Sequence, residues 1–168
     1  RAIYAQQAYA MRNPKKFIGY DRYSWGITAS DGPGPALRQI KGRTIRFYDY
    51  LARSFPYGPD DGTLAPWAVA ASLPFAPEIV LPTLEHCSRK YPNMENEYGL
   101  VCSFNPTFPS RGSGRSGWMS KDHFALDQGP VILMIENYRS GLIWRLMRSC
   151  PYVVTGLRRA GFTGAWLG

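Results

Sequence analysis

Proline residues divide this sequence into short segments and limit where its helices can begin and end. The residue before a proline avoids the helical region of backbone space, so Asn13-Pro14 ends a helix predicted over residues 2–11. Pro74 ends a second helix, predicted over residues 65–72 with Thr63 as its candidate cap. The sequence therefore favours short helices that are separated by clear breaks.

A third helix is predicted to run from Pro77 to Lys90, where apolar residues recur at roughly helical spacing. Pro82 lies inside that pattern and indicates either a kink or a start closer to Pro82. The strongest helical pattern follows Gly129-Pro130. There one apolar stripe is continuous through Val131, Met134, Ile135, Tyr138, Leu142 and Leu146. Trp144 lies off that stripe, which indicates a second contact surface, and a final helix is predicted over residues 152–160.

The segments between these helices have the composition of loops. Residues 19–35 are rich in Gly, Pro, Asp and Ser, and residues 95–115 hold many turn residues without a clear period. Residues 41–51 have alternating and β-branched character, which indicates a short hairpin or an irregular excursion. Because helices dominate and strands are few, the predicted fold class is all-α with long loops.

Charge and cysteine content exclude several classes of partner. The formal net charge is +8, but the basic residues come in ones and twos, so no nucleic-acid partner is expected. Three cysteines without a CxxC pair, together with two histidines, predict no metal site, and no cofactor is expected. No apolar stretch reaches the length of a membrane span, so none is expected in this chain.

The chain is rich in aromatic residues, with five Trp, eleven Tyr and eight Phe. Aromatic faces stack on the C–H faces of sugars, so this excess fits a glycan cleft, and it also fits ordinary core packing. Three carboxylates that lie beside Gly and Pro residues or within an apolar helical pattern are candidate catalytic groups, namely Asp31, Asp127 and Glu136. Each also has a plain structural interpretation: Asp31 as a turn residue, Asp127 as a helix cap and Glu136 as a surface ion pair.

Glu136 lies beside apolar residues on the most apolar helix of the chain. Such a carboxylate is either desolvated, which raises its proton affinity, or paired with a base such as Arg139. Both arrangements occur in sugar-cleaving sites, where one carboxylic acid protonates the leaving oxygen and a second carboxylate handles water or the anomeric carbon. The residues alone predict a helical domain with a carboxylate and aromatic cleft.

Several sequence blocks occur in one order along most of the chain. They are Trp25 to Pro33, Asp61 to Pro66, Ser72 to Pro77, Asp127 to Pro130, and Met134 to Trp144. This set resembles the glucoamylase-like domain of bacterial endo-β-1,2-glucanases and of the transglycosylating part of cyclic β-1,2-glucan synthases.

The resemblance implies an (α/α)₆ toroid, in which six helical hairpins ring a glucan-binding cleft. Twelve helices of about 12 residues with connections of about 5 need roughly 200 residues, more than this chain has. We therefore expect residues 1–168 to be the C-terminal portion of one such domain, with its N-terminal portion outside this chain. The resemblance also implies a bacterial protein of the periplasm or inner membrane.

The activity implied by the resemblance is that of a glycoside hydrolase acting on β-glucan, with β-1,2-glucan as the expected substrate. Glu136, Asp31 and Asp127 are then the candidate catalytic carboxylates. The candidate substrate contacts are Trp25, Tyr98, Asn105, Trp118, Tyr138 and Arg139. Tyr138 and Arg139 can equally be interpreted as partners of other protein groups.

One residue departs from the family pattern. Residues 98–105 resemble a block of the family in which an Asp is common at the position of Cys102. If that Asp orders the substrate or the catalytic water, this protein binds differently or works poorly. A catalytically silent glycan-binding domain therefore stays open as an alternative hypothesis. The resemblance also keeps open a transglycosylase of cyclic β-1,2-glucan synthesis.

Overall fold

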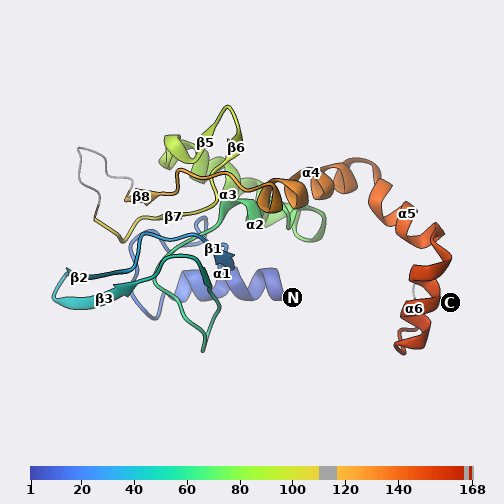
Figure 1. Ribbon diagram of the computed structural model, residues 1–168, viewed down its shortest axis with the longest axis horizontal. Helices are drawn as coiled ribbons and strands as arrows, with labels where there is room; N and C mark the ends of the chain where they lie inside the picture. Colours follow the sequence, from blue (N-terminus) through green and yellow to red (C-terminus); the bar gives the residue numbers. More distant parts are fainter. Residues whose placement is uncertain (110–116, 165–166, 168) are drawn as a thin grey trace.

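A computed structural model describes residues 1–109, 117–164 and 167 of the chain (Figure 1). Helices hold the largest share of these residues. The α-helices are α1 (Ala2–Arg12), α2 (Pro66–Ala70), α3 (Pro77–Lys90), α4 (Ala125–Ser140), α5 (Leu142–Ser149) and α6 (Pro151–Arg159). Two short 3₁₀ helices, η1 (Leu73–Phe75) and η2 (Pro92–Met94), follow α2 and α3.

Helices predominate as predicted, but short strands accompany them, so the chain is not purely all-α. Within the described ranges, four two-stranded antiparallel sheets form. They pair β1 (Ala29–Ser30) with β4 (Leu51–Ala52), β2 (Ala36–Ile40) with β3 (Arg43–Phe47), β5 (Glu95–Asn96) with β6 (Gly99–Leu100), and β7 (Phe104–Asn105) with β8 (Trp118–Met119). The described part of the chain is therefore mainly helical, with four small sheets. Several of these strands lie in segments whose composition predicted loops.

Residues 41–51, predicted as a hairpin or an irregular excursion, supply the turn and the second strand of a hairpin, whose first strand lies before them at Ala36–Ile40. Strands β2 and β3 pair from Ala36 opposite Phe47 to Ile40 opposite Arg43. Lys41 and Gly42 join them, and both have positive φ, 49° and 75°. Two successive residues with positive φ match the tight turn that suits the twist of paired strands.

The hydrophobic core lies among α1, α2, α3 and the short strands. Phe47, Leu64, Val69, Val80, Met94 and Phe104 are almost completely buried there. Helix α3 follows its predicted bounds and carries Pro82 inside it. Strand β7 is tied to the segment before α2, because Leu64 and Phe104 exchange backbone hydrogen bonds of 2.8 and 2.9 Å. This tie brings residues 102–105 beside the chain that enters α2.

Helix α4 begins earlier than predicted and ends sooner. It starts at Ala125, because Phe124 is extended and its carbonyl accepts the backbone N–H groups of Asp127 and Gln128 at 2.9 and 3.1 Å. Pro130 therefore lies within the helix instead of opening it. The helix ends at Gly141, whose φ of +67° is the left-handed conformation that glycine adopts without strain.

The apolar stripe predicted as continuous from Val131 to Leu146 is therefore divided between α4 and α5. Helix α5 starts directly after Gly141, where the backbone N–H of Trp144 donates to Asn137 Oδ1 at 3.1 Å. The prediction of a second contact surface at Trp144 is confirmed, since its ring packs against Phe75 of η1 with centroids 5.8 Å apart.

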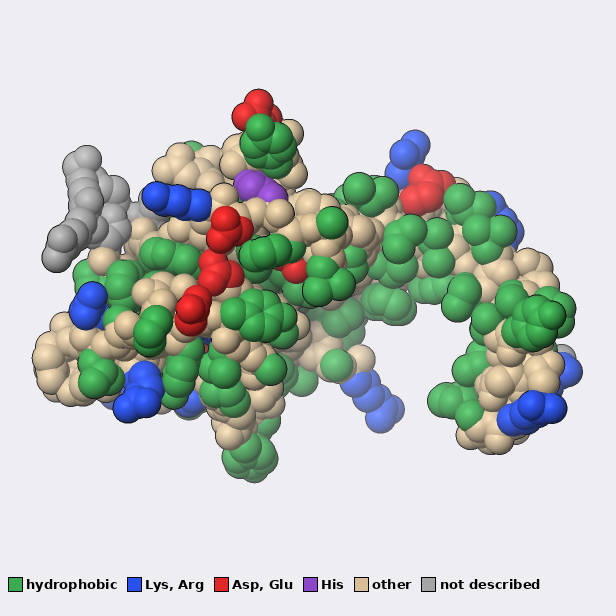
Figure 2. All heavy atoms as spheres, in the orientation of Figure 1, with side chains coloured by type: hydrophobic (Ala, Val, Ile, Leu, Met, Phe, Trp, Pro, Cys, Tyr) green, Lys and Arg blue, Asp and Glu red, His purple; other side chains and the backbone are tan. Residues whose placement is uncertain are grey.

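Helices α5 and α6 extend away from the rest of the chain (Figure 1), and neither contributes a buried residue. Large apolar side chains lie exposed along this region, as Figure 2 shows for one face. The exposed large apolar residues on α4, α5 and α6 are Leu126, Ile132, Leu133, Ile135, Tyr138, Leu142, Trp144, Leu146, Met147 and Tyr152, which we call the apolar arm. None of the helices in the described part of the chain is long and apolar enough to cross a bilayer.

Candidate functional site

A fully buried ion pair fixes the loop that carries Asp31. Arg53 donates from Nε and Nη2 to the two carboxyl oxygens of Asp61, at 2.8 and 3.0 Å, and both side chains are wholly buried. Its Nη1 atom donates to the carbonyl of Ser30 at 2.5 Å. Burial raises the pKa of Asp61, but the hydrogen bonds and charge of Arg53 outweigh that effect and lower the pKa overall. Arg53 thus ties the end of β1 to the segment before α2.

Asp60, which precedes Asp61 in the sequence, accepts hydrogen bonds from two tyrosine hydroxyls. Tyr20 and Tyr9 donate to its two carboxyl oxygens at 2.6 and 2.9 Å. Burial and the charge of Asp60 raise the pKa of both tyrosines, so they remain protonated donors. The result is a polar network beneath the candidate site, with α1 attached to it through Tyr9.

Asp31 follows β1 and is held by two serines from distant segments. Ser120 donates to Asp31 Oδ2 at 2.9 Å, and Ser103 donates to the Asp31 carbonyl at 2.7 Å. The side chain is half-buried and bonds to a residue 89 positions away. The turn interpretation of Asp31, in which its side chain bonds to nearby backbone, is therefore not what the structure shows.

Cys102 lies between Asp31 and Asp127. Its thiol is buried, contacts the Asp31 backbone N–H and is hydrogen-bonded to the Asp127 carboxyl group. Burial is the main cause that raises the pKa of the thiol to about 12, so it stays neutral at ordinary pH. Two of the three predicted carboxylates thus meet around the residue that departs from the family pattern.

Asp127 is nine-tenths buried in the first turn of α4, with 5% of its surface exposed. Burial raises the pKa of its carboxyl group, and the hydrogen bond from Cys102 offsets only part of this effect. Its Oδ2 atom has no hydrogen-bond partner among the described residues. It does not cap α4, since the N-cap is Phe124 and no side-chain cap bond forms there. A buried carboxyl group with a free oxygen is suited to hold a proton.

Glu136 lies apart from this cluster, further along α4. Its Oε1 accepts from Ser140 at 2.5 Å, and its Oε2 lies 3.8 Å from Arg139. The side chain is 38% exposed, so Glu136 forms the surface ion pair that was one of its sequence interpretations. The structure does not bring it to Asp31 or Asp127 through any hydrogen bond or ion pair of the described residues.

Two of the six predicted substrate contacts are buried in protein packing. Trp25 is 2% exposed and donates from Nε1 to Thr83 Oγ1 at 2.9 Å. Asn105 is fully buried, and its amide bonds to Asp61, Thr63, Thr107 and Phe108. These positions favour the packing interpretation for Trp25 and Asn105, since their polar atoms already have protein partners.

The other four predicted contacts are accessible. Tyr98 is 69% exposed at the β5–β6 turn, with its ring centroid 5.8 Å from that of His123. Trp118 is half-buried on β8, directly opposite Asn105. Tyr138 and Arg139 are exposed on α4. Tyr98 and Trp118 therefore belong to the two strand pairs, β5–β6 and β7–β8, on either side of Cys102, while Tyr138 and Arg139 accompany Glu136.

Sequence reasoning missed Arg53, Ser103 and Ser120 at this site. No local pattern marks them, because their partners lie far along the chain. Two adjacent carboxylates, Asp60 and Asp61, in a chain with few acidic residues are the one available signal in the sequence. No group of three His, Cys, Asp or Glu side chains within the described ranges is arranged to hold a metal ion.

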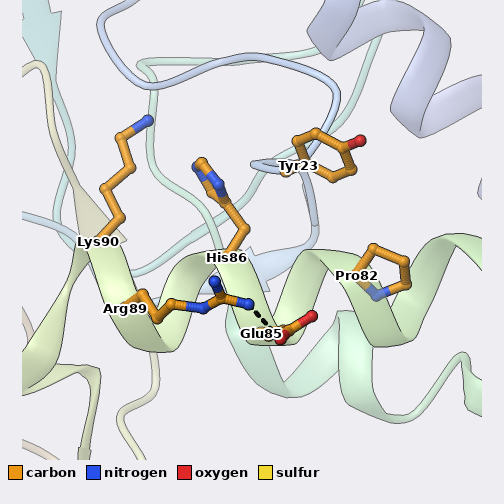
Figure 3. A pocket seen from close by; sticks show the side chains of 6 residues that line it. All are labelled: Tyr23, Pro82, Glu85, His86, Arg89 and Lys90. Atoms are coloured by element: carbon orange, nitrogen blue, oxygen red, sulfur yellow. Dashed lines mark ion pairs between the residues drawn. The ribbon is translucent and has the colours of Figure 1, made fainter.

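Two hollows accompany the site. An apolar pocket of about 450 Å³ lies between α3, α4 and the β5–β6 turn, and it includes Leu100 and Gln128, close in sequence to Cys102 and Asp127. A second pocket, of about 430 Å³, lies on α3 facing the 21–24 turn (Figure 3). Glu85 lines both, so the two hollows adjoin across α3.

Comparison with solved structures defines the class of fold. The chain is similar to the crystal structure of a putative glucoamylase from Bacteroides uniformis, with 38% identity and a TM-score of 0.77 over 97% of this chain and 34% of that one. It is also similar to an endo-β-1,2-glucanase from Chitinophaga pinensis in complex with sophorotriose and glucose. The identity is 31% and the TM-score 0.77, over 98% of this chain and 34% of the other. The class is that of glucoamylase-like folds.

The chain belongs to the family described as "Putative glucoamylase", whose model matches residues 1–151. A curated relative is the exo β-1,2-glucooligosaccharide sophorohydrolase (non-reducing end) of Parabacteroides distasonis, 32% identical over 154 residues. That match covers 91% of this chain and 18% of the relative. The chain thus spans about a fifth of the curated relative and a third of the two solved structures.

Proposed function

We propose that the protein containing this chain is a glycoside hydrolase that cleaves β-1,2-glucan. The observation that carries the proposal is the similarity, at 31–32% identity across more than nine-tenths of the chain, to two proteins named for hydrolysis of β-1,2-linked glucose. The acidic cluster of Asp31, Cys102 and Asp127 lies within that aligned length. Both the family and the local chemistry therefore support a sugar-cleaving reaction.

Asp127 is the candidate proton donor of this reaction. Glycosidases pair one carboxylic acid, which protonates the leaving oxygen, with a carboxylate that activates water or attacks the anomeric carbon. Burial raises the pKa of Asp127, so its carboxyl group keeps its proton to higher pH than an exposed one. Asp31 and Glu136 are the candidate partners, and Tyr98, Trp118, Tyr138 and Arg139 are the accessible candidates for sugar contact.

We further propose that residues 1–168 form the C-terminal part of a larger (α/α)₆ toroid. The chain aligns with only about a third of each similar solved structure. The apolar arm supports the same view, because large exposed apolar surfaces mark places where other protein packs. An N-terminal portion of the same polypeptide would cover this arm and complete the cleft. The periplasm or the inner membrane of a bacterium remains the proposed location, to be checked by cell fractionation.

The test is to incubate the full-length protein with linear β-1,2-glucan and follow the product lengths by chromatography. Shorter linear products are expected, with β-1,3- and β-1,4-glucans left uncut as controls. Cyclic or redistributed products would instead assign the protein to the alternative class, a transglycosylase of cyclic β-1,2-glucan synthesis. Unchanged glucan in all reactions contradicts both enzymatic proposals.

A catalytically silent glycan-binding domain is the second candidate, and Cys102 favours it. A thiol with a pKa of about 12 is neutral and cannot replace a carboxylate as a base. Affinity for β-1,2-glucan without new reducing ends or altered chain lengths would support this candidate against the hydrolase.

A further inference from the structure

The pocket between α3 and the 21–24 turn has walls fixed by several bonds. Asp21 and Ser24 bridge through their backbones, with two hydrogen bonds of 3.3 Å. The thiol of Cys87 donates to the Tyr23 carbonyl at 3.3 Å, and Lys90 pairs with Asp21 at 3.2 Å. The turn is therefore anchored to α3 on both sides of Tyr23, so the hollow of about 430 Å³ exists before any ligand enters.

The pocket presents an aromatic wall. Figure 3 shows the Tyr23 ring on the turn and the His86 side chain rising from α3 on the side where Tyr23 lies. Their centroids are 5.4 Å apart with an interplanar angle of 32°. Tyr23 is 38% exposed, so part of its ring faces the opening. The Nε2 atom of His86 is buried without a hydrogen-bond partner among the described residues, which leaves hydrogen-bonding capacity unused at this wall.

The charged groups of the pocket compensate one another. Arg89 pairs with Glu85 one turn earlier on α3, as the dashed line in Figure 3 marks, and Lys90 pairs with Asp21. Both side chains of the first pair are about two-thirds or more exposed, so their donors and acceptors remain available to a ligand. The pocket thus offers both kinds of hydrogen-bonding group without a strong net charge, which suits a neutral ligand with many hydroxyls better than an anion.

We propose that this pocket is a glucan-binding subsite separate from the Asp31–Asp127 cluster, with Tyr23 as its stacking platform and the Glu85–Arg89 pair binding sugar hydroxyls. This inference rests on β-1,2-glucan as the substrate of the proposed function. Glu85 also lines the apolar pocket that reaches Gln128, the neighbour of Asp127. Because Glu85 lines both pockets, a long glucan in the apolar pocket would extend across α3 to this subsite, whereas a short one would end before it.

The experiment measures binding of long and short linear β-1,2-glucans to the full-length protein by calorimetry, for Tyr23→Ala and Arg89→Gln. Tyr57→Ala is the matched control, because Tyr57 is 99% exposed elsewhere on the surface. We expect each pocket variant to weaken binding of long glucan by about fivefold, a loss in the range of one aromatic or charged contact, and to leave short-glucan binding unchanged. Arg89→Gln removes an exposed side chain, so it tests the subsite even if Tyr23→Ala loosens the turn.

Turnover separates this proposal from the proposed function. Where the protein cleaves β-1,2-glucan, the pocket variants should raise KM for long glucan with kcat unchanged. Cleavage with wild-type affinity in both pocket variants overturns the subsite and leaves the hydrolase standing. Glucan binding that both variants weaken, in a protein without cleavage, supports the subsite and contradicts the hydrolase.

Discussion

The thiol of Cys102 is hydrogen-bonded to the carboxyl group of Asp127, and the second oxygen of that carboxyl has no partner among the described residues. Burial raises the pKa of both groups, so neither favours its ionised form. The pair therefore joins the residue that departs from the family pattern to the candidate proton donor. A carboxylate at position 102 would place two acids side by side, and their repulsion would raise the pKa of one of them further.

Cys102→Asp is the substitution most directly suggested by this contact. If the thiol limits catalysis, a carboxylate there supplies the missing base, and turnover of β-1,2-glucan should rise by a factor on the order of 10². Reducing-end assays on the full-length protein measure the change. Cys102→Ser is the control, because a hydroxyl has similar size but cannot act as the base, and its turnover should stay at the starting level. Equal turnover of the Asp and Ser variants would show that position 102 does not limit the reaction.

Asp127→Asn should change how stability depends on pH. The folded-state pKa of Asp127 is raised above its ordinary value of 3.8, so its contribution to stability is full below that pH and is lost as pH rises through the folded-state pKa. The asparagine variant lacks this loss. The difference in Tm, variant minus wild type, should therefore become more positive from acidic to neutral pH in thermal melts. A difference that stays constant over this range would contradict a raised pKa for Asp127.

The family resemblance could be read from the sequence, but the contacts of the site could not. Blocks such as the one at residues 127–130 are contiguous, so a single sequence displays them. The hydrogen bonds from Ser120 and Ser103 to Asp31 span 89 and 72 positions, and no local sequence pattern near any of the three residues predicts them. Asp31 and Asp127 were therefore predicted as separate candidates, and only the fold places them around Cys102.

The helices show the same division between local and tertiary signals. Helix α3 followed its predicted bounds because proline marks its start and apolar spacing its length. Helix α4 did not, since Pro130 is tolerated inside it and the helix starts at Ala125, with Phe124 as its N-cap. The apolar stripe that predicted one long helix continues across Gly141, and its period gives no sign of the left-handed residue that separates α4 from α5.

Arg53→Met should destabilise the fold strongly. It leaves the buried carboxylate of Asp61 without its partner, and breaking one side of a buried ion pair costs about 3–5 kcal/mol. Urea unfolding of the full-length protein measures the loss. The double substitution Arg53→Met with Asp61→Leu removes both charges and should regain much of the stability, although the carbonyls of Ser30 and Tyr48 lose their bonds from Arg53 in either case. A double variant no more stable than the single one would show that the backbone bonds of Arg53, rather than its charge pairing, hold this region.

Glu136→Gln distinguishes a catalytic carboxylate from a surface ion pair. The pair with Arg139 is exposed and long, so its loss should change the free energy of unfolding by no more than about 0.5 kcal/mol. If Glu136 serves the reaction with Asp31 or Asp127, turnover of β-1,2-glucan should fall by about 10² or more while stability holds. We expect this combination, because Tyr138 and Arg139 lie exposed beside Glu136 and offer groups for sugar contact. Asp49→Asn, which also removes an exposed carboxylate but lies between β3 and β4, is the matched control and should retain full turnover. Full turnover in Glu136→Gln would leave Asp31 and Asp127 as the catalytic candidates of this chain and assign Glu136 to the surface of α4.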